Sequence, residues 1–106
     1  MQKNAVAVIF ANQRTTADAE GYAAAAAAMV AAAERQPGYL GIHSVRDESG
    51  FGITVSYWAD DAAAQAWRDD PAHSAIRGQG RAGWYEWYDL QVATVIRAYD
   101  WRRGGD

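Results

Sequence analysis

Apolar and polar side chains alternate with a period of two in four segments of the chain, which predicts four β-strands. We expect these strands at residues 4–13, 39–47, 51–58 and about 88–99. The third strand is the clearest, because its apolar and aromatic positions alternate with mostly small ones in the run Phe51-Gly-Ile-Thr-Val-Ser-Tyr-Trp58. The turn residues 48–50 predict that the second and third strands form a hairpin.

A helix is predicted between the first two strands. Thr15 or Thr16 can cap its start, and Pro37 followed by Gly38 ends it. Its apolar stripe recurs at i, i+4, i+7, i+8 and i+11 and consists of Tyr22, Ala26, Met29, Val30 and Ala33. Alanine on this face either lets the helix lie close to a sheet or leaves room for a bound molecule.

Two short helical segments are predicted after the third strand. Asp60 stands where an N-cap is needed, ahead of small and unbranched side chains that favour a helix. Asp70 and Pro71 then form a second N-cap with proline at the first helical position, so a separate helix carries His73, Ile76 and Arg77. Three glycines between residues 78 and 83 predict a loop or a broken helix end.

The element order is therefore strand, helix, strand, strand, helix, strand. Two right-handed crossovers joined by a hairpin give an α+β, ferredoxin-like βαββαβ domain over residues 1–100, with a four-stranded antiparallel sheet and helices on one face. Residues 101–106 form a polar tail. The first and last strands offer apolar side chains to both sheet faces, so we expect a second copy to cover the open face in a homodimer.

The amino-acid composition argues against several classes of function. The 106 residues carry a net charge of −3, which argues against a nucleic-acid partner. The absence of cysteine excludes disulfides and thiolate chemistry and favours a cytoplasmic protein. The most apolar run, residues 22–33, is shorter than the roughly 20 residues that span a bilayer, so no membrane association is expected. Five Trp and six Tyr are the informative excess, and no spacing of His, Asp and Glu predicts a metal site.

Several short segments together resemble one known family. They are Ala5-Val-Ala-Val-Ile-Phe10, Gln13-Arg-Thr15, Gln36-Pro-Gly-Tyr-Leu-Gly41, Gly52-Ile-Thr-Val-Ser-Tyr-Trp58, Ala66-Trp67, Asp70-Pro-Ala-His73, Gly80-Arg81 and Trp84-Tyr85. In this order and spacing the chain resembles the antibiotic biosynthesis monooxygenase (ABM) superfamily of dimeric α/β barrels. It looks most like the small stand-alone bacterial members.

The resemblance implies a monooxygenase without metal or organic cofactor, acting with dioxygen on an aromatic or polycyclic, polyketide-like molecule. Once deprotonated, an electron-rich phenol or anthrone can itself pass an electron to oxygen, so the protein has to hold, deprotonate and stabilise it. We expect His73, Trp67 and Arg77 to be catalytic. His73 lies near a helix N-terminus, which lowers its pKa and suits a base, and Arg77 can hold an anionic oxygen. Substrate binding is expected from Asn12, Tyr57, Trp58, Trp84 and Tyr85.

Two other functions stay open. The haem-degrading branch has an asparagine late in the first strand, a tryptophan matched by Trp67, and an axial histidine. Gln13 falls at the asparagine position, with Asn12 one residue off on the opposite face, and the axial position falls nearer Arg77 than His73. Because arginine cannot ligate iron, haem is the alternative cofactor only. The third possibility is a non-catalytic binding or stress-response module of the same fold.

Each candidate residue also has a purely structural interpretation. His73 can bond to the backbone, Trp67 can be plain core, and His43 can be structural. The aromatic residues 84–88 can belong to a dimer interface, since interfaces favour Trp and Tyr.

Overall fold

The structure is a computed structural model that describes residues 1–105, and within them strands and helices follow the predicted order. The elements are β1 (Val6–Arg14), α1 (Ala19–Glu34), β2 (Tyr39–Arg46), β3 (Phe51–Trp58), α2 (Asp61–Arg68), α3 (Pro71–Gln79), a π-helical turn η1 (Gly80–Trp84) and β4 (Tyr85–Thr94). None of the helices among residues 1–105 has the length and apolar character needed to cross a bilayer.

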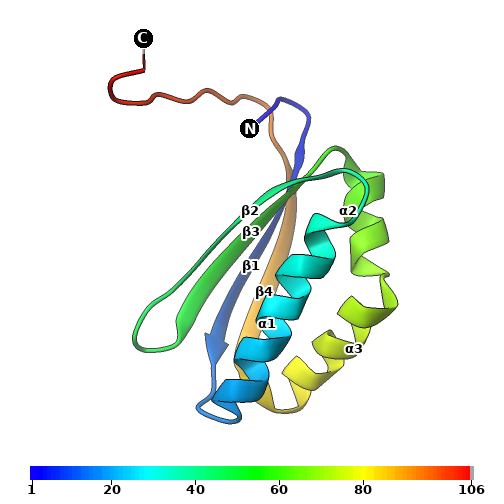
Figure 1. Ribbon diagram of the computed structural model, residues 1–106, viewed down its shortest axis with the longest axis vertical. Helices are drawn as coiled ribbons and strands as arrows, with labels where there is room; N and C mark the ends of the chain where they lie inside the picture. Colours follow the sequence, from blue (N-terminus) through cyan, green and yellow to red (C-terminus); the bar gives the residue numbers. More distant parts are fainter. Residues whose placement is uncertain (106) are drawn as a thin grey trace.

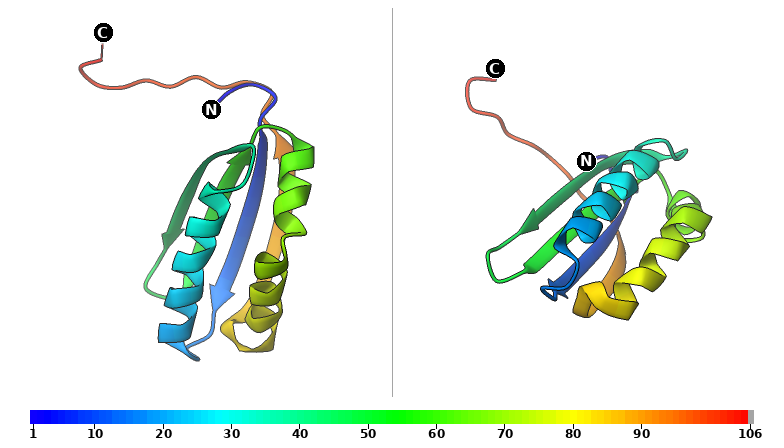
Figure 2. Two further views of the ribbon diagram at one scale, coloured as in Figure 1. Left: turned by 45° about the vertical axis from the view of Figure 1, so that its right-hand side comes forward. Right: turned by 60° about the horizontal axis from the view of Figure 1, so that its bottom comes forward.

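The four strands form one antiparallel sheet in the order β2-β3-β1-β4. Both crossover connections lie on the same side, so α1, α2 and α3 cover one face of the sheet and the other face carries no helix (Figures 1 and 2). This confirms the predicted α+β, ferredoxin-like arrangement.

The predicted caps of the two short helices are confirmed. The Asp60 carboxylate accepts the Ala63 N–H at 2.8 Å. Asp70 Oδ1 accepts the Ala72 and His73 N–H groups at 3.0 and 3.1 Å, with proline at the start of α3. The Asp70 cap therefore holds the backbone of His73 directly.

The predicted cap of α1 is wrong. Asp18, not Thr15 or Thr16, caps this helix, and its side chain accepts the Gly21 N–H at 3.1 Å. Asp18 has a left-handed φ of 51°, which Asp tolerates better than most residues. Thr15 instead donates its hydroxyl to the Gly83 carbonyl at 2.7 Å, tying the end of β1 to η1.

The last strand also differs from the prediction at both ends. It begins at Tyr85, because β1 continues to Arg14 and pairs with it there, and it ends at Thr94 and not at Tyr99. The pairing with the first strand ends at Val95, whose N–H donates to the Ala5 carbonyl and whose carbonyl accepts the Asn4 N–H, both at 2.8 Å. Beyond it the chain runs away from the domain (Figure 1) and exposes Ile96, Tyr99 and Trp101. Asp106 of the predicted tail lies outside the described residues.

The solid core is small and lies where α2 crosses the sheet. Its buried members are Val6, Ala33, Trp58, Ala64 and Trp67. Within α1 only Ala33 is fully buried. The rest of the space between α1 and the sheet is therefore not filled by side chains.

Candidate functional site

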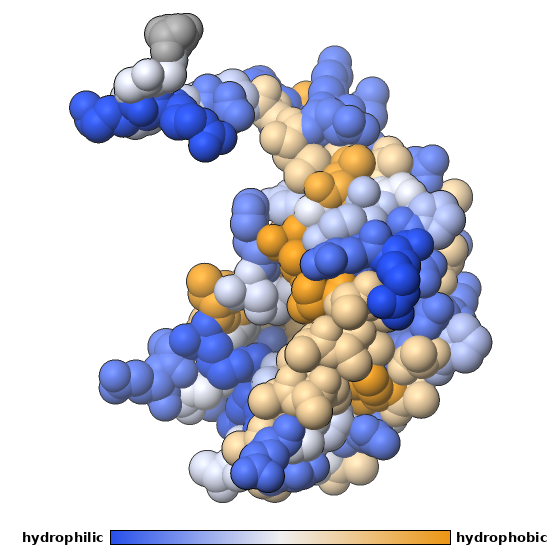
Figure 3. Space-filling view, in the orientation of Figure 1, coloured by the Kyte–Doolittle hydropathy of each residue, from blue (hydrophilic) through white to orange (hydrophobic). Residues whose placement is uncertain are grey.

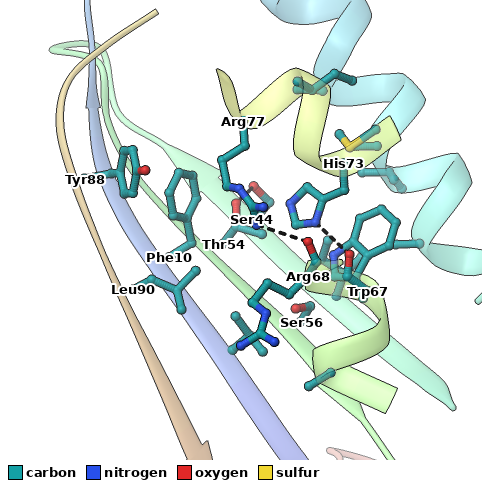
Figure 4. Close-up of a pocket in the computed structure, with 18 of the residues that line it drawn as sticks. Phe10, Ser44, Thr54, Ser56, Trp67, Arg68, His73, Arg77, Tyr88 and Leu90 are labelled. Atoms are coloured by element: carbon teal, nitrogen blue, oxygen red, sulfur yellow. Dashed lines mark hydrogen bonds between the residues drawn. The ribbon is translucent and has the colours of Figure 1, made fainter. Parts of the chain in front are cut away.

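A cavity of about 440 Å³ lies between the helices and the covered face of the sheet. All five residues of the predicted α1 stripe line it, together with Val8 and Phe10 of β1 and Leu90 and Val92 of β4. Alanine on α1 thus leaves room beneath the helix, which was one of the two alternatives. Figure 3 shows weakly hydrophobic side chains gathered over α1, and Figure 4 shows the cavity.

The three predicted catalytic residues all line this cavity. Trp67 comes from the last turn of α2, and His73 and Arg77 come from α3, one turn apart (Figure 4). The Asp70 cap fixes the first residue of α3 and therefore the positions of His73 and Arg77 on that helix. Their catalytic roles stay predictions.

The His73 ring is held in one orientation and one tautomer. It stacks on the Trp67 indole with centroids 4.4 Å apart and an interplanar angle of 13°. Its Nδ1 lies 3.0 Å from the Trp67 carbonyl oxygen, which can only accept, so Nδ1 carries a hydrogen. Among residues 1–105 nothing bonds to Nε2. In the neutral ring this nitrogen therefore keeps a lone pair for a ligand.

The pKa of His73 is lowered from its ordinary value of 6.5, mainly because burial disfavours the charged ring. The Arg77 charge lowers this pKa further, whereas the Trp67 carbonyl bond and Asp70 oppose the shift. The direction agrees with the prediction, but the largest cause is burial and not the helix N-terminus. At neutral pH the ring is mostly neutral and suited to act as a base.

Trp58 was predicted to touch the substrate, and the structure places it in the core instead. It is completely buried, donates its indole N–H to the Ser56 hydroxyl at 3.0 Å, and stacks behind Trp67 with centroids 5.9 Å apart. Strand alternation points it to the covered face, but Trp67 lies between it and His73. Trp58 therefore supports Trp67 and does not line the cavity.

Arg77 bridges the two short helices. Its guanidinium donates to the Arg68 carbonyl at 3.1 Å and to the Ser74 hydroxyl at 3.2 Å. The first bond satisfies a carbonyl at the end of α2 that has no partner within its helix. The remaining N–H groups of the half-buried side chain leave Arg77 able to face an anionic oxygen.

Trp84 and Tyr85 line the cavity as predicted, near the N-terminus of α1. The Trp84 indole N–H donates to Asp18 at 3.3 Å. The Tyr85 hydroxyl donates to the Tyr22 hydroxyl at 3.4 Å. Burial raises the pKa of Tyr85 well above its usual range, so this hydroxyl stays protonated.

Tyr57 and Asn12 were also predicted to bind substrate, but like Trp58 they do not line the cavity. Tyr57 lies on the helix-free face, because it shares strand parity with Ile53 and Val55, and there it packs against His43 at 5.7 Å between centroids. Asn12 is on the covered face but is completely buried behind the cavity wall. Its Oδ1 accepts a bond from Arg46 at 2.8 Å, whereas its Nδ2 has no partner among the described residues.

Asn12 belongs to a polar cluster that no sequence pattern indicated. Arg46, at the end of β2, donates to Asn12, to the Gly50 carbonyl and to the Tyr22 hydroxyl. Arg14 lies over the Tyr22 ring with its Cζ 3.9 Å from the centroid. Strand parity could have placed Asn12 and Arg46 on the covered face, but nothing in the sequence pairs either with Tyr22 of α1.

The acidic and imidazole side chains do not gather. Within residues 1–105 there is no group of three or more His, Asp or Glu side chains that could hold a metal ion. The cavity wall instead carries polar side chains of mixed kind: His73, Arg68, Arg77, three tyrosines, Asp61, Gln65, Ser44, Thr54 and Ser56.

The sequence model of the family described as antibiotic biosynthesis monooxygenase matches residues 5–79. The chain belongs to this family. The match runs from the start of β1 to the end of α3, so it includes Trp67, His73 and Arg77 but not Tyr85.

Individual proteins resemble this chain in sequence or in structure. The chain is 46% identical over 91 residues to the uncharacterized protein YqjZ of Bacillus subtilis (strain 168), covering 86% of this chain and 79% of that protein. It is similar in structure to SnoaB, a cofactor-independent oxygenase from Streptomyces nogalater, with a TM-score of 0.76, 18% identity and coverage of 90% and 96% of the two chains. Rv0793 from Mycobacterium tuberculosis has a TM-score of 0.79 at 15% identity, covering 91% of this chain and 99% of that one. These structural likenesses show the fold alone.

Proposed function

We propose that this ABM protein is an oxygenase that uses no bound cofactor and acts on a flat aromatic or polycyclic molecule held between its helices and sheet. The cavity is mostly apolar, has room for a small ring system, and offers a neutral imidazole with an unused lone pair. The description of SnoaB as a cofactor-independent oxygenase supports the same chemistry on this fold.

The proposed reaction needs only the substrate and dioxygen. His73 Nε2 removes a proton from an activated methylene or phenolic hydroxyl group, and the substrate anion passes one electron to dioxygen. The resulting superoxide and substrate radical combine at carbon, and the peroxide takes up a proton and loses water to leave a carbonyl. In sum, one methylene group and one dioxygen give one carbonyl group and one water. Arg77 stabilises the substrate anion, and Trp67 keeps the imidazole oriented.

The observation that carries the proposal is the His73 ring, fixed by the stack and by the Trp67 carbonyl with Nε2 unused. Oxygen uptake with dithranol, an electron-rich anthrone, tests it against the uncatalysed rate without protein. We expect catalysed uptake that EDTA does not change and one quinone formed per oxygen consumed. Uptake that His73→Gln leaves unchanged would reject the proposed base.

We further propose that the protein is a homodimer joined through the helix-free face. This face presents Ile9, Val45, Ile53, Val55 and Tyr57 from three neighbouring strands. Val45 is 72% exposed in the single chain and Ile53 36% exposed, which is unfavourable in water for side chains of this size. A second copy presents the same apolar surface and can cover it isologously.

Haem binding is the second candidate function, favoured by one observation. The unused Nε2 of His73 in an apolar cavity fits the chemistry of an iron ligand. The asparagine of the haem-degrading branch has no counterpart in the cavity, because Asn12 is buried behind Arg46. Titration with haemin tests binding: a Soret shift that is lost in His73→Ala would favour this function over the first.

A further inference from the structure

The cavity has a second polar group of side chains, at the end away from the Trp58–Trp67 stack. Trp58 pairs with Val6 of β1, whereas Tyr88 pairs with Asn12 and Tyr85 with Arg14. The two ends are thus separated by six to eight strand positions, roughly 20 to 26 Å of β1. In Figure 1, α1 begins near the start of β4, which brings Tyr22 to this second end.

Tyr22 stands at the centre of this group. Its ring meets those of Trp84 and Tyr85 edge to face, with centroids 5.7 and 5.8 Å apart. Its hydroxyl oxygen accepts a bond from Arg46 at 2.6 Å and one from the Tyr85 hydroxyl at 3.4 Å. Both tyrosines line the cavity.

Counting hydrogens shows that this group is incomplete. The two hydroxyls carry two hydrogens, and their mutual bond uses one. Arg46 can only donate, so the second hydroxyl hydrogen has no acceptor among residues 1–105. Both tyrosines line the cavity, so a ligand oxygen bound there could accept this hydrogen.

The surrounding charge also favours an oxygen acceptor. Arg46 and Arg14 lie on the Tyr22 ring at 5.3 and 3.9 Å from its centroid, and neither has a carboxylate partner within the described chain. Asn12 and the Gly50 carbonyl hold Arg46 in place. Burial raises the pKa of Tyr85, so this end donates protons to hydrogen bonds and does not remove them.

We infer that Tyr22 and Tyr85, backed by Arg46, form a subsite that binds a carbonyl or phenolic oxygen on the edge of the substrate away from His73. The inference rests on the proposed function and narrows its substrate class. The molecule carries the acidic hydrogen near one end of a flat ring system and an oxygen acceptor toward the other. Phe10 and Tyr88, with ring centroids 5.3 Å apart, provide apolar surface between these ends.

Fluorenone and fluorene test the subsite, because they have the same flat shape and differ by one carbonyl oxygen. Quenching of tryptophan fluorescence reports binding, since Trp67 and Trp84 line the cavity. In Tyr85→Phe, Tyr22 keeps its hydrogen and its Arg46 bond, so fluorenone affinity should change less than about twofold. In Tyr22→Phe, only the Tyr85 hydroxyl remains, which accepts no bond from Arg46, and fluorenone affinity should fall about threefold. The double variant should lose about tenfold, while fluorene binding stays within about twofold throughout.

Tyr99→Phe, in the exposed C-terminal segment, is the matched control and should leave both affinities unchanged. Wild-type protein that fails to bind fluorenone, or a double variant that binds it as well as wild type, would overturn the inference. If the double variant does not fold, a weaker fluorenone complex in Tyr22→Phe than in Tyr85→Phe supports it and equal affinities refute it. Binding does not require turnover. If the double variant loses the preference for fluorenone and the wild-type protein shows no catalysed oxygen uptake, the subsite is supported and only the oxygenase proposal is rejected.

Discussion

The imidazole of His73 lies parallel to the indole of Trp67, 4.4 Å away, and bonds to the carbonyl of the same residue. One tryptophan thus determines both the plane of the ring and the nitrogen that carries the hydrogen. This double constraint leaves Nε2 as the position at which His73 can take a proton from a ligand.

Catalysed oxygen uptake should depend on the neutral form of His73. Because its pKa lies below 6.5, uptake should be constant above neutral pH and should fall as pH drops through a value below 6.5. His73→Gln should lower uptake at least about a hundredfold, as expected for a lost general base. A pH–rate profile of both proteins provides the measurement, and a wild-type midpoint above 6.5 would contradict the burial argument.

The same shift has a consequence for stability. A depressed pKa means that the unfolded chain binds a proton more readily than the folded one, so the His73 contribution is present above pH 6.5 and lost as pH falls through the folded pKa. Between the folded pKa and pH 6.5 the free energy of unfolding should therefore rise with pH. Urea unfolding at a series of pH values should show a shallower rise for His73→Gln than for wild type.

Two substitutions of Trp67 distinguish its contribution to packing from its proposed role in orienting His73. Trp67→Ala should destabilise the fold by about 3–5 kcal/mol, because the ring is 8% exposed and packs on Trp58. Trp67→Phe should cost less and keep the fold, yet lower oxygen uptake, because a smaller ring holds His73 less firmly. Thermal unfolding and oxygen uptake are measured on the same preparations. If Trp67→Phe and His73→Ala alter stability only, the non-catalytic module becomes the better interpretation.

The cap of α3 positions His73 without touching a ligand. Asp70→Ala removes the acceptor of the His73 N–H and should cost about 1 kcal/mol of stability. It should also reduce turnover and shift the pH midpoint, since the ring leaves its stack. Asp70→Asn retains a capping oxygen and should restore both quantities most of the way. If Asp70→Ala and Asp70→Asn have equal turnover, the cap acts on stability alone.

The fold could be predicted because its signals are local. Alternation of side chains located four strands, and the capping aspartates at 60 and 70 separated two short helices. The errors arose where long-range contacts decide. Tyr85 joins the last strand only because Arg14 pairs with it, and Thr15 fails to cap α1 because Gly83 takes its hydroxyl.

The site could be predicted in part for the same reason. His73 and Arg77 face one cavity because they lie one turn apart on a single helix. Tyr57 has an aromatic side chain suited to stacking, but its parity with Ile53 puts it on the helix-free face, away from the cavity. The bond between Arg46 and Tyr22 joins residues 24 positions apart on different elements, and no local pattern records it.

Asn12 should matter for stability more than for ligand contact. Asn12→Ala removes the Oδ1 acceptor of a guanidinium bond at 2.8 Å in a fully buried position, which should cost about 1–3 kcal/mol. Gln13→Ala, one residue on and facing the other side, removes an exposed bond to the Ser49 carbonyl and should cost less. Urea unfolding of the pair provides the comparison, and equal losses would contradict the assigned role of Asn12.

The apolar helix-free face predicts that the protein is a dimer. Sedimentation of the wild-type protein at micromolar concentration should give about twice the chain mass of 11.6 kDa. Ile53→Lys places a charge in the middle of the apolar face, between Ala11 of β1 and Val45 of β2. Burying that charge against an identical partner would leave it unpaired, so the variant should sediment as a monomer.

A matched variant separates this effect from added charge. Ala28 lies on the exposed side of α1, so Ala28→Lys adds the same charge away from the proposed interface and should remain dimeric. If both variants dissociate, net charge and not the sheet face controls association. A wild-type protein that sediments at 11.6 kDa would contradict the proposed dimer. The cavity on the helix side would then have to function in a single chain.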